Sequence, residues 1–199
     1  MPKVVDHEQR RTEVAAAARA AIADRGLDGA TVRDIAAAAG VSTGVLAHYF
    51  RDKDELLLQA LRDSYEAAAG RMLRAGRRNP GLEAVRGMLE EELPLDDPAR
   101  AEFRVWLAFW GRAAYNPALA GEQAAGCRVW RRLIEEAIRI GTEDGSIRPD
   151  ISPADEAEAL MAFVDGMGLQ ATLEPGRLPP KRQRALLELQ LSRLKGSSQ

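Results

Sequence analysis

The chain has 199 residues, a formal net charge of −2 and 46% hydrophobic residues, which suits one globular domain or a small domain joined to a larger one. One cysteine and two histidines exclude an intramolecular disulfide and a His/Cys metal cluster. Because the sequence has neither a leader segment nor an apolar run of the ~18–20 residues that cross a bilayer, we expect a cytoplasmic protein without membrane, metal or cofactor.

The composition predicts an all-α fold, because alanine, leucine, arginine and glutamate dominate while β-branched and aromatic residues are sparse. Apolar residues recur at helical spacing in about nine segments that glycine and proline separate. These segments are residues 7–25, 31–39, 43–50, 51–77, 82–92, 98–115, 118–144, 153–174 and 180–195. We predict two domains, residues 1–53 with three helices and residues 54–199 with the others.

The second and third segments have the layout of a helix-turn-helix. Thr31 and Ser42 are placed to cap the two short helices, and Gly40 permits the tight turn between them. Val45 is expected to pack inward with two other apolar residues of the second helix. The first turn of that helix would enter the major groove of DNA, where short polar residues suit the base edges.

Eight residues are the candidate DNA contacts, some facing bases and others phosphates. They are Thr31, Arg33, Ser42, Thr43, Gly44, His48, Tyr49 and Lys53. Residues 1–53 carry eight basic and seven acidic side chains, a net charge of +1, so we expect few phosphate contacts. The alternative, an ordinary helical hairpin, does not explain why polar residues stand beside the glycines.

Aromatic residues gather in the middle of the chain, where all three tryptophans lie between positions 106 and 130. The candidate ligand site consists of Trp106, Phe109, Trp110 and Trp130. Several acidic residues could add the negative charge that a quaternary ammonium or other cation attracts: Glu90, Glu91, Glu92, Glu102 and Asp165. The alternative interpretation is an aromatic core.

The string TVRDIAAAAGVSTGVLAHYFRDKDELL (residues 31–57) resembles the signature of the TetR family of bacterial transcription regulators. The matching residues are Thr31, Ile35, Ala36, Ala39, Gly40, Val41, Ser42, Gly44, Leu46, Tyr49, Phe50 and Lys53. Ala47 departs from the family, which commonly has a phosphate-contacting tyrosine there. Met1-Pro2-Lys3-Val4, VSTGVLAHYFRDK and WLAFW (residues 106–110) resemble the BetI-like branch, repressors associated with choline and betaine metabolism.

This resemblance implies a homodimeric repressor that binds a palindromic operator in double-stranded DNA and is released by a small-molecule effector, with choline-like cations as candidates. It also implies that residues 1–53 are a helix-turn-helix DNA-binding domain and residues 54–199 a ligand-binding and dimerisation domain. The last two helices would form a four-helix bundle with their counterparts, with which the apolar stripes of 153–174 and 180–195 are compatible. Two other classes compete with a regulator. A protein–protein adaptor is one, and the other is a helical enzyme, for which no nucleophile–base pair or phosphate loop is visible.

Overall fold

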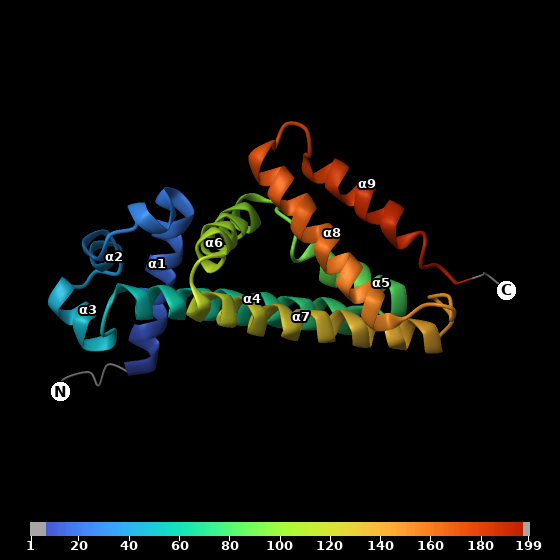
Figure 1. Ribbon diagram of the computed structural model, residues 1–199, viewed down its shortest axis with the longest axis horizontal. Helices are drawn as coiled ribbons and strands as arrows, with labels where there is room; N and C mark the ends of the chain where they lie inside the picture. Colours follow the sequence, from blue (N-terminus) through green and yellow to red (C-terminus); the bar gives the residue numbers. More distant parts are fainter. Residues whose placement is uncertain (1–6, 197–199) are drawn as a thin grey trace. The chain divides into compact units, whose positions relative to one another are not determined.

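The computed structural model describes residues 7–196, which hold nine α-helices and no β-strand beyond an isolated bridge between Ile147 and Lys195 (Figure 1). The helices are α1 (His7–Gly29), α2 (Val32–Ala38), α3 (Thr43–Tyr49), α4 (Lys53–Arg78), α5 (Gly81–Glu90), α6 (Asp97–Ala113), α7 (Pro117–Glu143), α8 (Pro153–Leu173) and α9 (Pro180–Leu191). The all-α prediction is confirmed, and each predicted segment corresponds to one helix. The predicted resemblance at Met1–Val4 lies outside the described residues.

Local sequence accounts for several helix ends. α1 leaves the helical conformation at Gly26, directly after the predicted segment 7–25. α8 begins with Pro153, whose missing N–H costs nothing in the first turn, and the Ser152 hydroxyl accepts a hydrogen bond from the Asp155 N–H (3.3 Å). None of the helices within residues 7–196 combines the length and apolarity that a membrane crossing requires.

The chain packs into two compact units. The first consists of Met1–Tyr65 and Arg104–Gln123, and the second consists of Glu66–Phe103 and Ala124–Gln199. α4, α6 and α7 therefore each contribute residues to both units. This division follows packing, whereas the predicted boundary between residues 53 and 54 concerns function and stays a prediction.

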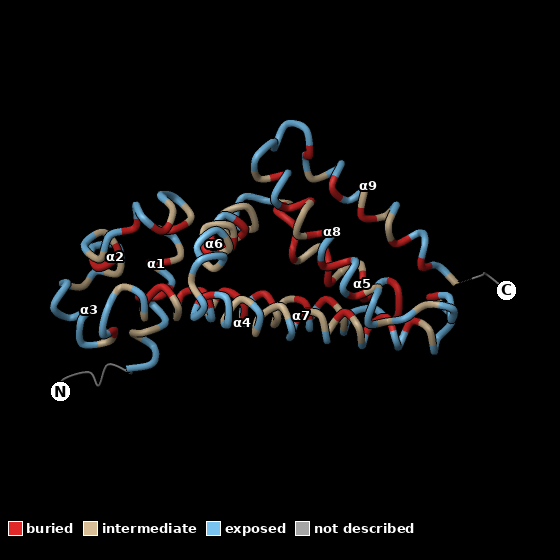
Figure 2. The backbone as a smooth tube through the Cα atoms, viewed as in Figure 1, coloured by how far each residue is buried: buried red, intermediate tan, exposed pale blue. Residues whose placement is uncertain are grey.

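The apolar stripe of α4 supplies core residues along the whole helix. Buried positions recur at helical spacing, as Figure 2 shows. They include Leu57, Leu61, Ser64, Ala68, Met72 and Ala75, the residues that share one face in an ideal helix. Sequence periodicity alone identifies this face.

In the first unit, residues 104–123 pack beside the N-terminal helices. The Trp106 indole is buried and its Nε1 donates a hydrogen bond to the Ser64 hydroxyl (2.9 Å). Closer to the surface, the Arg62 Nε donates to the Glu122 carboxylate (2.9 Å). A segment distant in sequence is therefore an integral part of this unit.

In the second unit, α5, α8 and α9 contact one another. Gly168 of α8 lies against the ring of Phe103, which occupies the space that a Cβ atom at this position would need. Both residues are buried. Leu169 and Leu173 of α8 and Leu189 of α9 are exposed.

Candidate functional site

The turn between α2 and α3 is fixed by backbone geometry. Gly40 has φ of +67°, a left-handed conformation that glycine adopts without steric cost. Its N–H bonds to the Ala37 carbonyl (3.1 Å) and the Val41 N–H bonds to the Ala36 carbonyl (2.9 Å), a Schellman motif that ends α2. The predicted tight turn is present, and it sets where α3 begins.

Side-chain caps fix the first turn of both short helices. The Thr31 hydroxyl accepts a hydrogen bond from the Asp34 N–H (3.2 Å) and donates one to the Asp34 carboxylate (2.6 Å), which lowers the pKa of Asp34. The Ser42 hydroxyl accepts a hydrogen bond from the Val45 N–H (3.2 Å). Both predicted caps are therefore present.

Beyond its cap, α3 presents a small polar surface to solvent. Thr43, Gly44 and His48 are exposed on this helix, and Arg33 is exposed on α2. Within residues 7–196, Arg33 forms no hydrogen bond or ion pair, so its guanidinium is available to a ligand. With the exposed caps Thr31 and Ser42, six of the eight predicted contact residues thus lie at the surface of α2, α3 and their first turns.

The prediction that Val45 packs inward is wrong, because 44% of this residue is exposed. A seven-residue helix has one narrow inward stripe, which Leu46 occupies. Val45 instead lies beside the polar surface of α3, where an aliphatic group can contact the methyl group of thymine. Sequence analysis missed this candidate contact because it assigned Val45 to the core.

Arg11 of α1 connects the end of α3 with α4, and no local sequence signal indicates this role. Its guanidinium donates a hydrogen bond to the Tyr49 carbonyl and stacks over the Phe50 ring, with its Cζ 4.5 Å from the ring centroid. It also donates to the Gln59 amide oxygen (3.5 Å). Arg11 therefore helps to fix the orientation of α3.

Two further predicted DNA contacts also have structural partners. The Lys53 ammonium donates a hydrogen bond to the Leu27 carbonyl (3.0 Å). Tyr49 is half-buried, with its ring centroid 4.8 Å from that of His7. The roles of Tyr49 and Lys53 toward DNA stay predictions.

The aromatic residues of the candidate ligand site are divided between the two units. Trp106, Phe109 and Trp110 belong to the first unit, and Trp130 belongs to the second. Trp106 is only 2% exposed, and Phe109 borders a cavity of about 100 Å³, smaller than sites for drug-sized ligands. These observations support a packing role for Trp106, and the ligand-binding role of the four residues stays a prediction.

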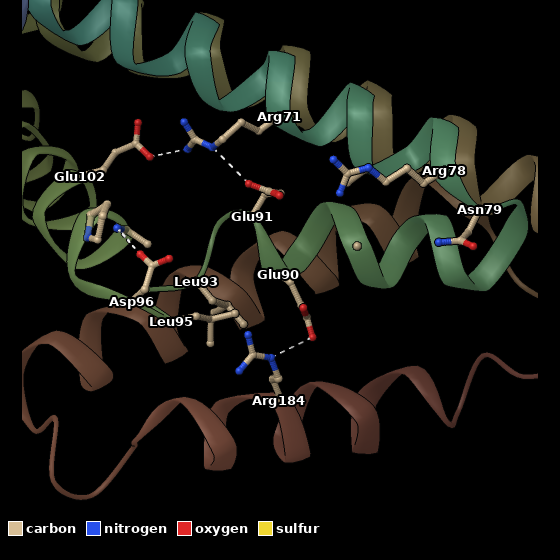
Figure 3. Close-up of a pocket in the computed structure, with 14 residues that line it drawn as sticks. Arg71, Arg78, Asn79, Glu90, Glu91, Leu93, Leu95, Asp96, Glu102 and Arg184 are labelled. Carbon is tan, nitrogen blue, oxygen red and sulfur yellow. Dashed lines mark hydrogen bonds and ion pairs between the residues drawn. The ribbon is translucent and has the colours of Figure 1, made fainter.

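A larger cavity, of about 580 Å³, lies within the second unit (Figure 3). Its wall includes Arg71, which donates to Glu91 (3.1 Å) and to Glu102, and Arg184, which pairs with Glu90 (3.3 Å). Three of the five acidic residues that the sequence offered for a cation are therefore already neutralised by arginines. Glu92 and Asp165 are not among the residues that line this cavity.

Comparison with known proteins identifies both parts of the chain. Residues 14–60 match the family model for bacterial regulatory proteins of the tetR family, and residues 81–195 match the model for the C-terminal part of BetI-type transcriptional repressors. The chain is 34% identical over 183 residues to the HTH-type transcriptional regulator PksA of Bacillus subtilis (strain 168), which covers 92% of this chain and 88% of PksA.

Two other relatives extend this result. The HTH-type transcriptional regulator BetI of Escherichia coli (strain K12) is 32% identical over 193 residues, 94% of each chain. A transcriptional regulator from Saccharomonospora viridis, solved in complex with choline, superposes with a TM-score of 0.87 at 26% identity and covers 96% of this chain and 100% of its own. The capped helix-turn-helix, the helical remainder and these matches together show that the chain belongs to the TetR family of transcriptional regulators and has a BetI-type C-terminal part.

Proposed function

We propose that this protein is a dimeric repressor that binds a palindromic operator and leaves it when a cationic effector binds the C-terminal part. The observation that carries this proposal is the exposed surface of α3, which is held between the Ser42 cap and the Arg11 contacts. A rigid short helix with small polar side chains at its beginning suits entry into the major groove. The proposed setting is the cytoplasm, and the proposed role is regulatory rather than enzymatic.

The exposed leucines of α8 and α9 support dimerisation. Leu173 is 70% exposed and Leu189 is 58% exposed, whereas other leucines of the same helices are buried. Large apolar side chains exposed on neighbouring helices are typical of an interface. A two-fold dimer would present two copies of α3 about 34 Å apart, one turn of DNA, and would thus match a palindrome.

Two similarities support a cationic effector. The S. viridis regulator was solved with choline, and the model that matches residues 81–195 is of the BetI type. An effector can release the operator only through its difference in affinity for the DNA-bound and free conformations. The quantity to measure is therefore the change in operator affinity at saturating effector.

Operator binding tests the role of α3. We expect the ligand-free protein to shift the intergenic DNA beside its own gene. Thr43→Ala and His48→Ala are each expected to weaken specific binding about 5–150-fold, because one base contact contributes ~1–3 kcal/mol. Exposed Arg128 on α7 offers a control, and Arg128→Ala should leave the affinity unchanged. If the Thr43/His48 double variant still shifted the operator specifically, the proposed role of the α3 surface in DNA binding would be contradicted.

The charge balance predicts a shallow dependence of operator affinity on salt. Residues 1–53 carry a net charge of only +1, Lys53 is bonded to Leu27, and Ala47 replaces a common phosphate-contacting tyrosine. The slope of log K against log salt is about −0.9 per phosphate contact, so few contacts mean a small slope. Fluorescence anisotropy over a salt series measures it, and a steep slope would show that other basic residues contact phosphates.

A further inference from the structure

One buried and one half-buried carboxyl group in the second unit lack a compensating charge. Glu92, in the turn after α5, is only 3% exposed, and within residues 7–196 neither of its carboxylate oxygens has a hydrogen-bond partner. Asp165, on α8, is half-buried and lies close enough to repel the charge of Glu92. A buried carboxylate is stable only when it is paired or protonated, so this arrangement needs an explanation.

Two arginines of the surrounding helices are paired with other carboxylates. Arg71 of α4 pairs with Glu91 and Glu102, and Arg184 of α9 pairs with Glu90 (3.3 Å). Each of these pairs is partly exposed and lies along the wall of the cavity in Figure 3. None of these arginines is bonded to Glu92 or Asp165.

Two further arginines of the packed helices are paired in the same way. Arg86 of α5 pairs with Glu188 of α9 (2.9 Å) and with Glu83 of its own helix. Arg131 of α7 donates to Glu158 of α8 (3.3 Å). Among the described residues, neither Glu92 nor Asp165 forms an ion pair with a basic side chain.

An aromatic ring lies on the same stretch of α8. Phe103 packs against Gly168, three residues after Asp165, and residues three apart are neighbours on a helix surface. A buried and a half-buried acidic group near an aromatic ring are surroundings that attract an ammonium group, through charge and cation–π interaction. Carboxylates that are already paired with arginine, such as Glu91, have no uncompensated negative charge to offer a cation.

Protonation explains how the ligand-free protein tolerates the pair. Burial, and secondarily repulsion from Asp165, raises the pKa of Glu92 well above its usual range. Burial also raises the pKa of Asp165 to about 6. The pair therefore holds a proton to a higher pH than two free carboxyl groups would.

We propose that Glu92 and Asp165 together bind the positively charged group of the effector, and that this cation takes the place of a proton held by the pair. The O–H bond of the carboxylic acid breaks, the proton passes to solvent, and the resulting carboxylate faces the bound cation. This inference rests on the proposed function for a cationic effector and adds the residues that bind it. Effector affinity therefore depends on pH.

Calorimetry of the full-length protein without DNA tests the proposal, with choline and tetramethylammonium as probes and 3,3-dimethylbutan-1-ol as the neutral analogue of choline. Below the pKa of the pair, cation affinity should rise about tenfold per pH unit. Titrations in two buffers of different ionisation enthalpy should show release of about one proton per bound cation. The neutral analogue should bind more weakly and independently of pH.

Two variants and one control complete the test. Glu92→Gln and Asp165→Asn should each weaken choline binding about tenfold to a hundredfold, and Glu92→Gln should also abolish the buffer dependence. Glu66→Gln makes the same substitution at an exposed position on α4. It should change neither the choline affinity nor the buffer dependence. Equal binding of choline and its neutral analogue, unchanged binding by Glu92→Gln, or no binding by either cation would overturn the proposal.

Stability gives a readout that needs no ligand. Because both pKa values are raised, the folded protein keeps protons that the unfolded chain releases. The stabilisation is complete below about pH 4, the pKa of an unfolded carboxyl group, and the Asp165 contribution is lost as the pH rises through about 6. Glu92→Gln should flatten this fall and raise Tm near neutral pH, and an unchanged profile would also contradict the proposal.

These outcomes are separable from the proposed function. A protein that shifts its operator but binds no cation refutes the inference at Glu92 and Asp165 and leaves DNA binding intact. A protein that binds choline through the pair but keeps its operator affinity refutes release by this ligand and retains the site.

Discussion

A Leu173→Glu, Leu189→Glu double variant is expected to be monomeric and to bind the operator about 10²–10⁴-fold more weakly than the wild type. Both leucines are largely exposed in the single chain, so the substitutions leave the core of the second unit intact. In a dimer they would place unpaired carboxylates in an apolar interface, which is costly. Loss of the dimer removes the advantage of binding two half-sites at once.

Sedimentation velocity and gel shift measure the two effects separately. Tyr115→Glu provides a control, because Tyr115 is 92% exposed and lies outside α8 and α9. It should change neither the oligomeric state nor the operator affinity. If the double variant remained dimeric, the dimer interface would have to lie elsewhere than at Leu173 and Leu189.

Trp106→Ala is expected to lower the free energy of unfolding by about 3–5 kcal/mol, the usual cost of removing a buried tryptophan. The indole is fully enclosed, and its Nε1 bonds to the buried Ser64 hydroxyl. The truncation therefore creates a cavity and deprives a buried hydroxyl of its donor. Urea denaturation followed by circular dichroism measures the loss.

Trp110→Ala is the matched comparison, since Trp110 is on the same helix but only half-buried. Its cost should be clearly smaller. If instead Trp106→Ala left the stability unchanged and reduced effector affinity, Trp106 would belong to a ligand site rather than to the core. The pair of variants therefore decides between the two interpretations that the sequence left open.

Features that depend on residues close in sequence were predictable. The caps at Thr31 and Ser42, the turn at Gly40 and the buried stripe of α4 follow from residues at most a few turns apart. Helix geometry converts such spacings directly into faces and ends. The family signature at residues 31–57 was recognisable for the same reason, because it consists of cap, turn and core residues at fixed spacing.

Features that depend on distant residues were not predictable. Arg11 meets Tyr49 across 38 positions, and neither residue signals the other. The five acidic residues offered for a cation looked alike in sequence, and only packing separates the arginine-paired Glu90, Glu91 and Glu102 from Glu92 and Asp165. Val45 was misassigned because hydrophobicity alone does not give the width of the buried face on a short helix.

The continuity of α4, α6 and α7 across the two packing units limits how this regulator can be recombined. An exchange of sensing parts between relatives that cuts after residue 60 would separate Ser64 from its own helix-turn-helix and replace its partner Trp106 with a foreign residue. A chimera that keeps residues 1–65 and 104–123 from the same parent preserves the Arg62–Glu122 and Trp106–Ser64 contacts. Modular redesign of this protein therefore requires a graft in two pieces.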